Sequence, residues 1–456
     1  MFFDRAAELK ALQDHHKAAS KRSQLLVIYG RRRVGKTTLV KEFLKDVKGV
    51  YIFIEPKNEE LILKDCERVF GKAMGYMPRL DSWETLFDIA LAEKLTLVFD
   101  EFQNLGVVNP HLFSKMQKIW DEIDSKPGLF FIAIGSYVGM IKKIFRDGKQ
   151  PLFGRASGMM KLDPFDVFAT TQFLIEQNLT FEECMRVYAV FGGVPRYLVE
   201  VVAKKNNIWD LFFSPTSYLR EEGVNILSLE FGSQHKGYFS VLESISKGKS
   251  TPKEIADHAG MNIATVSKYL GELSDEYEMV KADRPATTTK KRFVRYHIKD
   301  NFFDFWFKYV HSNASFIEID PKAVWEETKR QLPAFTGLNM EDVVKEIMIT
   351  KRPFFSPTKL GRWWDRRGEE IDIVAVDEKS SKILFIEVKW VSRQVGWTVV
   401  EELKRKSKLV QWRAESRKEA FLTVSQKGFT KNCLRRMESE GIHHWDINDL
   451  KKLILD

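Results

Sequence analysis

Short apolar runs alternate with longer amphipathic stretches through the first third of the chain. The runs cover residues 25–30, 50–55, 95–101 and 129–136, and an amphipathic helix is expected over residues 1–20. Runs this short and this uniformly apolar are typical of strands buried on both faces of a parallel sheet. Because helical stretches separate them, the pattern predicts a parallel sheet between two layers of helices.

The pattern changes from Asp163. A stretch with helical periodicity comes first, then short helices followed by a basic segment, and finally a unit that reads helix, strand, strand, helix, strand, helix. A chain of 456 residues is expected to hold about three domains, and the α/β core here carries a helical lid of its own. We therefore expect four units, over residues 1–165, 166–232, 233–315 and 325–456.

The segment from Gly30 to Thr37 reads GRRRVGKT and fits the pattern G-x-x-x-x-G-K-[ST]. A strand before it and a helix after it are the context that a phosphate-binding loop (P-loop) requires. Backbone amides and the helix N-terminus surround the phosphates in such a loop. Lys36 is expected to reach the β- and γ-phosphates, and Thr37 to bind Mg²⁺, so ATP and Mg²⁺ are the expected cofactors. The expected nucleotide-binding residues are Gly30, Arg31, Arg32, Arg33, Val34, Gly35, Lys36, Thr37 and Thr38.

Polar residues end the third and fourth apolar runs. Asp100 and Glu101 end the third, and Ser136 ends the fourth. In a nucleotide-hydrolysing sheet an aspartate at this place holds Mg²⁺, and the adjacent glutamate polarises the attacking water. The acidic pair favours a hydrolase over a kinase, which must exclude water; the alternative is the start of a solvated loop. Ser136 either senses the γ-phosphate or belongs to a plain turn.

Four segments together resemble one known family. They are GRRRVGKT, LVFDE, PLFGRA (151–156) and GGVPRYL (192–198), and the opening FFDRAAEL (2–9) fits as well. Over nearly its whole length the chain is similar to an archaeal and bacterial family of AAA-type ATPases, distant relatives of origin-recognition ATPases and of multidomain signal-transduction ATPases.

This resemblance implies roles for two arginines. Arg155 would complete the transition-state site, in its own or a neighbouring subunit, because an arginine can neutralise charge that develops on the γ-phosphoryl group. Arg196 would read the nucleotide state from the lid. From sequence alone, Arg155 equally fits an ordinary surface position and Arg196 a salt bridge.

The middle unit contains a helix-turn-helix pattern. Thr251 and Glu254 form a capping box at the start of one helix, and a second helix is expected over residues 263–277. Thr265, Ser267 and Lys268 would face DNA from the second helix of a winged helix. The alternative is a protein-binding module or a rigid spacer. The basic residues of the expected wing, which would contact phosphates, are Lys281, Arg284, Lys290, Lys291, Arg292, Arg295 and Lys299.

The last unit contains a predicted β-hairpin, IDIVAVD (371–377) and ILFIEVKW (383–390), around a polar turn. Glu387 and Lys389 share one strand face, and Asp372 is expected roughly opposite Glu387. This is the D…E-x-K arrangement of restriction-endonuclease-like, PD-(D/E)xK folds. Asp372 and Glu387 would hold Mg²⁺, Glu341 would add a ligand, and Lys389 would position water or stabilise the phosphate.

Two questions about this unit stay open. The C-terminal domain of the resembled family is similar to these nucleases, which supports the fold more than the activity, so a DNA-binding domain without cleavage fits as well. Nearby tryptophans and arginines either stack bases and bind phosphates or form core and rim. They are Trp363, Trp364 and Trp390, with Arg362, Arg366 and Arg367.

The net charge of +9 is mild for this length, and basic residues concentrate in residues 281–299, 351–367 and 404–418. The three cysteines are too far apart in sequence for a zinc knuckle or a disulfide framework, which fits a reducing cytosol. The first residues are charged, unlike a signal peptide, and the longest apolar stretch, 128–141, is too short to span a bilayer. A cytoplasmic protein without membrane contact is expected.

Together these patterns predict an α/β multidomain protein: a P-loop, AAA-like αβα sandwich with a helical lid, a winged helix and a nuclease-like α/β domain. We expect a Mg²⁺-dependent ATPase that couples nucleotide state to DNA binding. One alternative is a nucleotide-dependent signalling switch whose C-terminal modules bind protein, and another is an ATP-gated DNA nuclease. DNA is the expected partner, with a protein partner and self-association also open.

Overall fold

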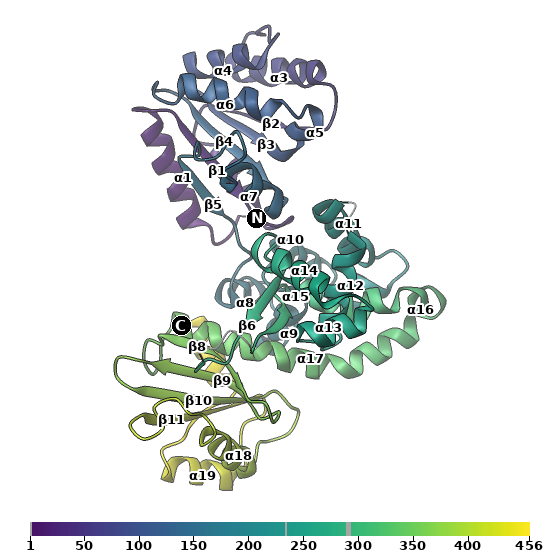
Figure 1. Cartoon of the computed structure of the whole chain (residues 1–456), viewed down its shortest axis with the longest axis vertical. Coiled ribbons are helices and arrows are strands. Elements are labelled where there is room, and N and C mark those ends of the chain that lie inside the picture. Colours follow the sequence, from purple (N-terminus) through teal and green to yellow (C-terminus); the bar gives the residue numbers. More distant parts are fainter. Residues whose placement is uncertain (1, 233–234, 289–292) are drawn as a thin grey trace. The chain divides into compact units, whose positions relative to one another are not determined.

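The computed structural model of the chain describes residues 2–232, 235–288 and 293–456 (Figure 1). The chain divides into two compact units. The first contains residues 1–164 and 226–232, and the second contains residues 165–225 and 233–456. Residues 166–225 of the predicted lid and the predicted units 233–315 and 325–456 therefore fall in the second unit, whereas residues 226–232 fall in the first.

The first unit is built on a five-stranded sheet with strand order β2-β3-β4-β1-β5. Every neighbouring pair is parallel, which confirms the predicted parallel sheet. The sequence pattern predicts four of these strands and misses β5, which is only partly buried. The strands are β1 (Gln24–Tyr29), β2 (Gly49–Phe53), β3 (Thr96–Asp100), β4 (Phe130–Gly135) and β5 (Gly158–Lys161).

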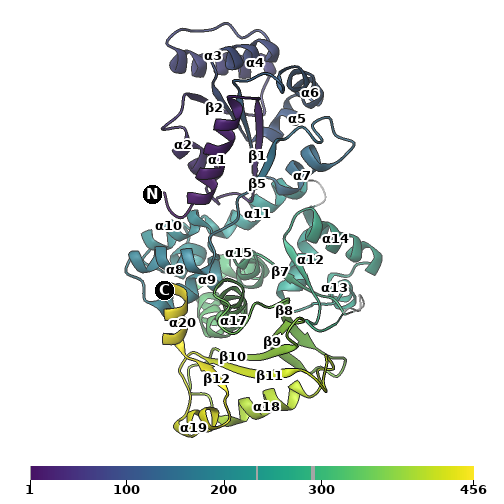
Figure 2. The same cartoon turned by 90° about the vertical axis from the view of Figure 1, so that its left-hand side faces the viewer.

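Helices cover both faces of this sheet, as Figure 2 shows. Side chains of β1 alternate between the faces. Leu26 and Ile28 pack with α1 and α2, whereas Leu25 and Val27 pack in a larger core with α3 to α7. The helices are α1 (Ala6–Ala19), α2 (Lys36–Phe43), α3 (Glu59–Met74), α4 (Trp83–Ala92), α5 (Leu105–Val108), α6 (Leu112–Ile123) and α7 (Val138–Arg146).

Residues 165–275 are mainly helical, and all of them except residues 226–232 belong to the second unit. Gly192 ends α9 at φ +58°, and a Cβ on Gly193 would lie 1.8 Å from the carbonyl oxygen of Phe165. The two glycines of GGVPRYL therefore serve a close turn, and Pro195 starts α10. The helices up to the hairpin are α8 (Val167–Glu176), α9 (Phe181–Phe191), α10 (Pro195–Ala203), α11 (Leu219–Phe231), α12 (His235–Ser246), α13 (Pro252–Ala259) and α14 (Ile263–Asp275).

A two-stranded antiparallel hairpin, β6 (Val280–Asp283) and β7 (Arg295–Ile298), follows α14. The predicted capping box at Thr251 and Glu254 is present at the start of α13. Lys290, Lys291 and Arg292 of the expected wing lie outside the described residues. The helices after the hairpin are α15 (Asn301–Phe305), α16 (Ala314–Ile319) and the long α17 (Pro321–Thr350).

The chain ends in a mixed sheet with strand order β12-β11-β10-β9-β8. β8, β9 and β10 are antiparallel, and β10, β11 and β12 are parallel. The strands are β8 (Lys359–Trp364), β9 (Glu370–Asp377), β10 (Lys382–Lys389), β11 (Lys418–Ser425) and β12 (His443–Trp445), and the helices are α18 (Trp397–Ser407), α19 (Lys431–Ser439) and α20 (Ile447–Leu455).

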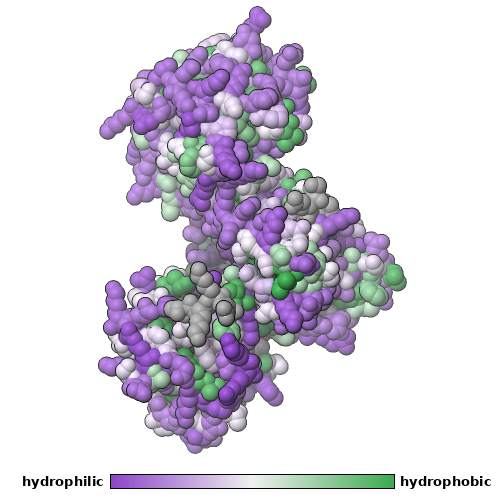
Figure 3. All heavy atoms as spheres, viewed as in Figure 1, coloured by the Kyte–Doolittle hydropathy of each residue, from purple (hydrophilic) through white to green (hydrophobic). Residues whose placement is uncertain are grey.

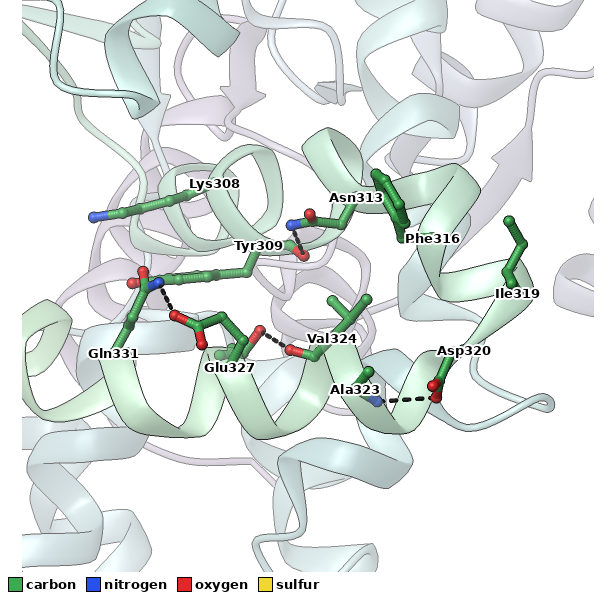
Figure 4. A pocket seen from close by; sticks show the side chains of 11 residues that line it. Lys308, Tyr309, Asn313, Phe316, Ile319, Asp320, Ala323, Val324, Glu327 and Gln331 are labelled. Carbon is green, nitrogen blue, oxygen red and sulfur yellow. Dashed lines mark hydrogen bonds between the residues drawn. The ribbon is translucent and has the colours of Figure 1, made fainter.

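Two surface features lie at α16 and the start of α17. A hollow of about 350 Å³ lies between α16 and the start of α17 (Figure 4), and none of the predicted site residues lines it. Apolar residues gather on the face over α16 (Figure 3), where Phe316 is 66% and Ile319 81% exposed. Within the described part of the chain, each helix is either too short or too polar to cross a membrane.

Candidate functional site

The P-loop joins β1 to α2 at the carboxyl edge of the first sheet. Gly30 lies so close to the chain after β5 that a Cβ would come within 2.2 Å of the carbonyl oxygen of Leu162. Gly35 has φ +95° at the N-cap of α2. Both positions therefore require glycine, and α2 begins at Lys36 with its free N–H groups facing the loop. The structure therefore places Gly30 to Gly35 in the loop, and Lys36 and Thr37 in the first turn of α2.

Lys36 is buried, with 5% of its surface exposed. Its Nζ donates to the carbonyl oxygens of Gly30 at 2.7 Å and Arg31 at 2.9 Å. Burial lowers the pKa of Lys36 to about 8, although Glu101 and Asp100 act in the opposite direction. The ammonium group therefore lies inside the curve of the loop, where it is poorly solvated and close to the acidic pair.

Asp100 at the end of β3 meets the P-loop. Oγ1 of Thr37 donates to its Oδ2 at 2.6 Å, and its Oδ1 accepts from the backbone N–H of Glu101 at 2.8 Å. The hydroxyl of Tyr51 in β2 also donates to Oδ2. Burial and this bond to Asp100 raise the pKa of Tyr51. Sequence reasoning missed Tyr51; the only signal was a polar hydroxyl inside the apolar run of 50–55.

Two neighbouring side chains hold Glu101. Ser136 donates to its Oε1 at 2.9 Å, and the amide of Gln103 donates to its Oε2. Glu101 has φ +54°, a left-handed conformation that costs a residue other than glycine about 1 kcal/mol or more. Ser136 therefore contacts the predicted catalytic carboxylate directly, and Gln103 is a second contact that sequence reasoning missed.

Among the arginines of the P-loop, Arg32 contacts Tyr137. Arg32 donates from Nη2 to the hydroxyl of Tyr137 at 2.8 Å, and its guanidinium lies 5.3 Å from the centre of that ring. Arg33 has φ +72°. Thr38, one residue after the motif, is exposed on α2. Arg32 thus ties the P-loop to the segment between β4 and α7.

The opening of the chain also reaches this edge. Arg5 bonds to Glu8 at 2.8 Å and to the carbonyl oxygens of Asp163 at 2.7 Å and Val34 at 3.4 Å. Val34 is fully buried beneath it. The arginine and glutamate of FFDRAAEL therefore lie beside the P-loop.

The structure does not bring Arg155 to the P-loop. Its guanidinium binds both carboxylate oxygens of Asp121, at 2.9 and 3.1 Å, in a surface pocket that also includes Gln24. Gln24 starts β1 and Gly30 follows its end, so six strand residues, about 20 Å, separate the two regions. Arg196 lies in the second unit, where it is exposed and pairs with Glu200 at 2.8 Å.

The acidic residues of the C-terminal sheet do come together. Residues 382–386 of β10 pair with residues 377–373 of β9, so the next pair along brings Glu387 opposite Asp372. Oδ2 of Asp372 accepts from the backbone N–H of Val388 at 2.8 Å. The charge of Asp372 raises the pKa values of Glu387 and of Glu341, and burial contributes more to both increases; the pKa of Glu341 rises to about 8.

Cations surround these carboxylates. Lys389 donates to Oε1 of Glu387 at 2.6 Å, Lys406 lies 3.9 Å from the same oxygen, and Arg362 donates to Glu341 at 2.7 Å. Oε2 of Glu387 is buried without a hydrogen-bond partner. Within the described ranges, no group of three or more His, Cys, Asp or Glu side chains is arranged as a metal site. The unpartnered oxygen thus belongs to the carboxylate whose other oxygen accepts from Lys389.

The β6–β7 hairpin packs against this sheet. Arg295 bonds to Glu370 at 2.9 Å, and its guanidinium lies 4.7 Å from the centre of a Trp364 ring. The backbone N–H of Ala286 donates to the carbonyl oxygen of Arg362 at 2.9 Å. Part of the basic segment thus binds the protein itself. Three tryptophans near the carboxylates are buried, each with 6% exposed surface, so they are core: Trp363, Trp364 and Trp390.

One face of the first half of α14 is exposed to solvent. Val266, Leu270 and Leu273 are buried on its inner side. The residues exposed on its outer side are Asn262, Ile263, Ala264, Thr265, Ser267, Lys268 and Gly271. The three residues predicted to face DNA are therefore all accessible.

Two protein families and a relative from Methanocaldococcus jannaschii match this chain. A family described as an ATPase domain predominantly from Archaea matches residues 2–201, and a family of archaeal and bacterial proteins of unknown function matches residues 306–404. An uncharacterized protein of Methanocaldococcus jannaschii is 34% identical over 425 residues, which cover 90% of this chain and 92% of that protein.

Two further similar proteins have names that refer to ATP. An uncharacterized ATP-binding protein of Pyrococcus abyssi is 28% identical over 234 residues, 45% of this chain and 70% of that protein. The solved structure of a Walker-type ATPase of Pyrococcus abyssi matches with a TM-score of 0.52 at 19% identity, over 67% of this chain and 96% of that one. At this identity the second likeness shows the fold alone.

Proposed function

The chain belongs to the family of ATPase domains found predominantly in Archaea, and from this premise we propose that it is a Mg²⁺-dependent ATPase that uses ATP to control DNA binding by its second unit. The observation that carries the proposal is the meeting of Thr37 and Asp100 at 2.6 Å beside Glu101. A P-loop threonine and two strand-end acids are the parts that ATP hydrolysis requires.

Each side chain of this site has a defined task. The Thr37 hydroxyl and the Asp100 carboxylate are oxygen ligands of the kind that Mg²⁺ takes, and this pair would hold the ion, which would neutralise charge on the β- and γ-phosphates. Lys36 contributes its charge to the same phosphates. Glu101 holds and polarises a water for attack, while its bonds to Ser136 and Gln103 fix its direction.

The hydrolysis step has a direct test. Glu101→Gln keeps a hydrogen-bonding group in place but cannot act as a base, so we expect turnover to fall at least about 100-fold while ATP still binds. Lys36→Ala is expected to lose binding as well. Glu122→Gln, an exposed carboxylate on α6, is the matched control and should keep full turnover. Equal turnover in the Glu101 variant and the wild type would contradict the proposed role.

The proposal of DNA binding depends on the solvent-exposed face of α14. A helix that follows a short helix and turn, with small polar side chains outward, is the arrangement that enters a major groove. The assay is binding of duplex DNA at several salt concentrations, and ATP hydrolysis with and without that DNA. We expect retention at low salt and faster hydrolysis with DNA. ATP binding without either effect would instead favour a signalling switch whose second unit binds protein.

A second candidate function is metal-dependent DNA cleavage by the C-terminal sheet. It is favoured by one observation, the buried and unpartnered Oε2 of Glu387 across from Asp372. Two carboxylates and Lys389 are the donor set for a divalent cation and a scissile phosphate. The proposal predicts nicking with Mg²⁺ or Mn²⁺ that is lost in Asp372→Asn but retained in Glu438→Gln, an exposed control on α19. Absence of cleavage would leave this sheet as a binding domain only.

A further inference from the structure

The end of α11 belongs to the ATP-binding unit, although the chain on both sides of it belongs to the second unit. Residues 226–232 group with residues 1–164. Ile226, Leu227 and Phe231 in this segment are buried. The same helix begins with residues 219–225, which are part of the second unit.

Glu230 makes the polar contact of this segment. Its Oε1 accepts a hydrogen bond at 3.0 Å from the backbone N–H of Gly139, in the first turn of α7. N–H groups in a first turn have no partner within their own helix, and a carboxylate satisfies them well. Ser136, which holds Glu101, and Tyr137, which binds Arg32, directly precede α7. Glu230 therefore docks at the same edge of the sheet as the hydrolysis site.

The Glu230 carboxylate also interacts electrostatically with Lys36 and Arg32, two cations of the P-loop. Lys36 and Arg32 both favour its charged form, but burial outweighs them and raises its pKa to about 7. In return, Glu230 acts on Lys36 in the same direction as Glu101 and Asp100. Nε of Arg32 is buried without a hydrogen-bond partner. The phosphates of a nucleotide bring further negative charge to these same two cations.

We propose that Glu230 discriminates ATP from ADP and couples that choice to the docking of residues 226–232. The γ-phosphate would repel the docked carboxylate, so ATP binds better when this segment is released, whereas ADP tolerates it. A ligand shifts a conformational equilibrium only by its difference in affinity for the two states, and this repulsion supplies the difference. The inference rests on the proposed ATP binding at the P-loop.

The test compares nucleotide binding in Glu230→Gln and the wild type. Glutamine keeps an oxygen for the N–H of Gly139 and removes only the charge. We expect a non-hydrolysable ATP analogue to bind about tenfold tighter, in the usual range of coupling between sites, while ADP binding changes less than about twofold. Glu221→Gln, an exposed carboxylate on the same helix, is the control and should change neither.

Hydrogen exchange of the wild-type protein gives a second measurement that depends on no variant. Amides of residues 226–232 should exchange faster with the ATP analogue than with ADP, and Glu230→Gln should abolish that difference. An equal change for both nucleotides, or no change for either, would overturn the role of Glu230. Failure of the wild type to bind any nucleotide would instead contradict the ATP site, so the two proposals fail in distinguishable ways.

Discussion

Nε of Arg362 donates to Oε2 of Glu341 at 2.7 Å, and both side chains are largely buried. Arg362 stands at an irregularity of the β8–β9 ladder, between Gly361 and Trp363, and its carbonyl oxygen pairs instead with Ala286 beyond β6. A bulge of this kind redirects a side chain. The hairpin contact therefore aims Arg362 at the carboxylate of Glu341.

Arg362→Ala should destabilise the second unit. The change leaves the buried Glu341 without its charged donor, which costs about 1 to 3 kcal/mol of the free energy of unfolding. Urea denaturation, followed by a probe in the second unit, measures the loss. Arg367→Ala, at an exposed arginine between β8 and β9, is the control and should lie within about 0.5 kcal/mol of the wild type. Equal stability of the two variants would show that the ion pair contributes nothing.

Tyr51→Phe should raise the Mg²⁺ concentration that ATP hydrolysis requires, without removing ATP binding. The variant loses the hydroxyl that donates to Oδ2 of Asp100, while Thr37 keeps its bond. A hydrogen bond to a charged group is worth about 1.5 to 3 kcal/mol, so we expect about tenfold more Mg²⁺ for half-maximal turnover. Titration of Mg²⁺ at saturating ATP checks this. An unchanged midpoint would mean that Tyr51 does not position Asp100.

ATP binding should weaken as the pH rises through 8. Burial lowers the pKa of Lys36 to about 8, so the ammonium form that attracts phosphate is lost above that pH. Bound phosphate favours the charged form, and binding should therefore take up a proton at pH 8.5 and none from Lys36 at pH 6.5. Calorimetry in buffers of different ionisation enthalpy measures the uptake. Lys36→Arg, which does not titrate here, should remove it; uptake that persists would assign the proton elsewhere.

DNA binding should depend on α14 more than on the hairpin. The side chain of Lys268 is 66% exposed and its ammonium group lies 3.7 Å from Glu272, whereas Arg295 is only 25% exposed and is engaged by Glu370 and Trp364. Lys268→Ala is expected to weaken duplex binding severalfold and to reduce the salt slope by about one, as for one lost phosphate contact. Arg295→Ala should leave the slope unchanged. The opposite ranking would show that the hairpin, not α14, faces DNA.

The parts of the fold that sequence alone predicts are those fixed by local pattern. Apolar runs predicted the parallel sheet, and the spacing from Gly30 to Thr37 predicted the P-loop, because both depend on neighbouring residues in the chain. Tyr51 was missed because its role depends on which strand pairs with β3. Glu230 was missed because its partner, Gly139, lies 91 residues away and no sequence pattern joins them. Contacts of this kind depend on how distant segments pair and pack. No local sequence motif indicates that pairing.

Arg155 should act on a neighbouring subunit if it takes part in hydrolysis. About 20 Å of β1 separates it from its own P-loop, and its pairing with Asp121 lies at the surface. Arg155→Ala should then reduce turnover at least about 100-fold, within the range for arginines that stabilise phosphoryl transfer. Mixing this variant with the inactive Lys36→Ala protein should restore measurable turnover, because intact P-loops meet intact arginines. Full activity of Arg155→Ala alone would contradict any role for Arg155, and loss without restoration on mixing would point to a structural defect, which a melting curve detects.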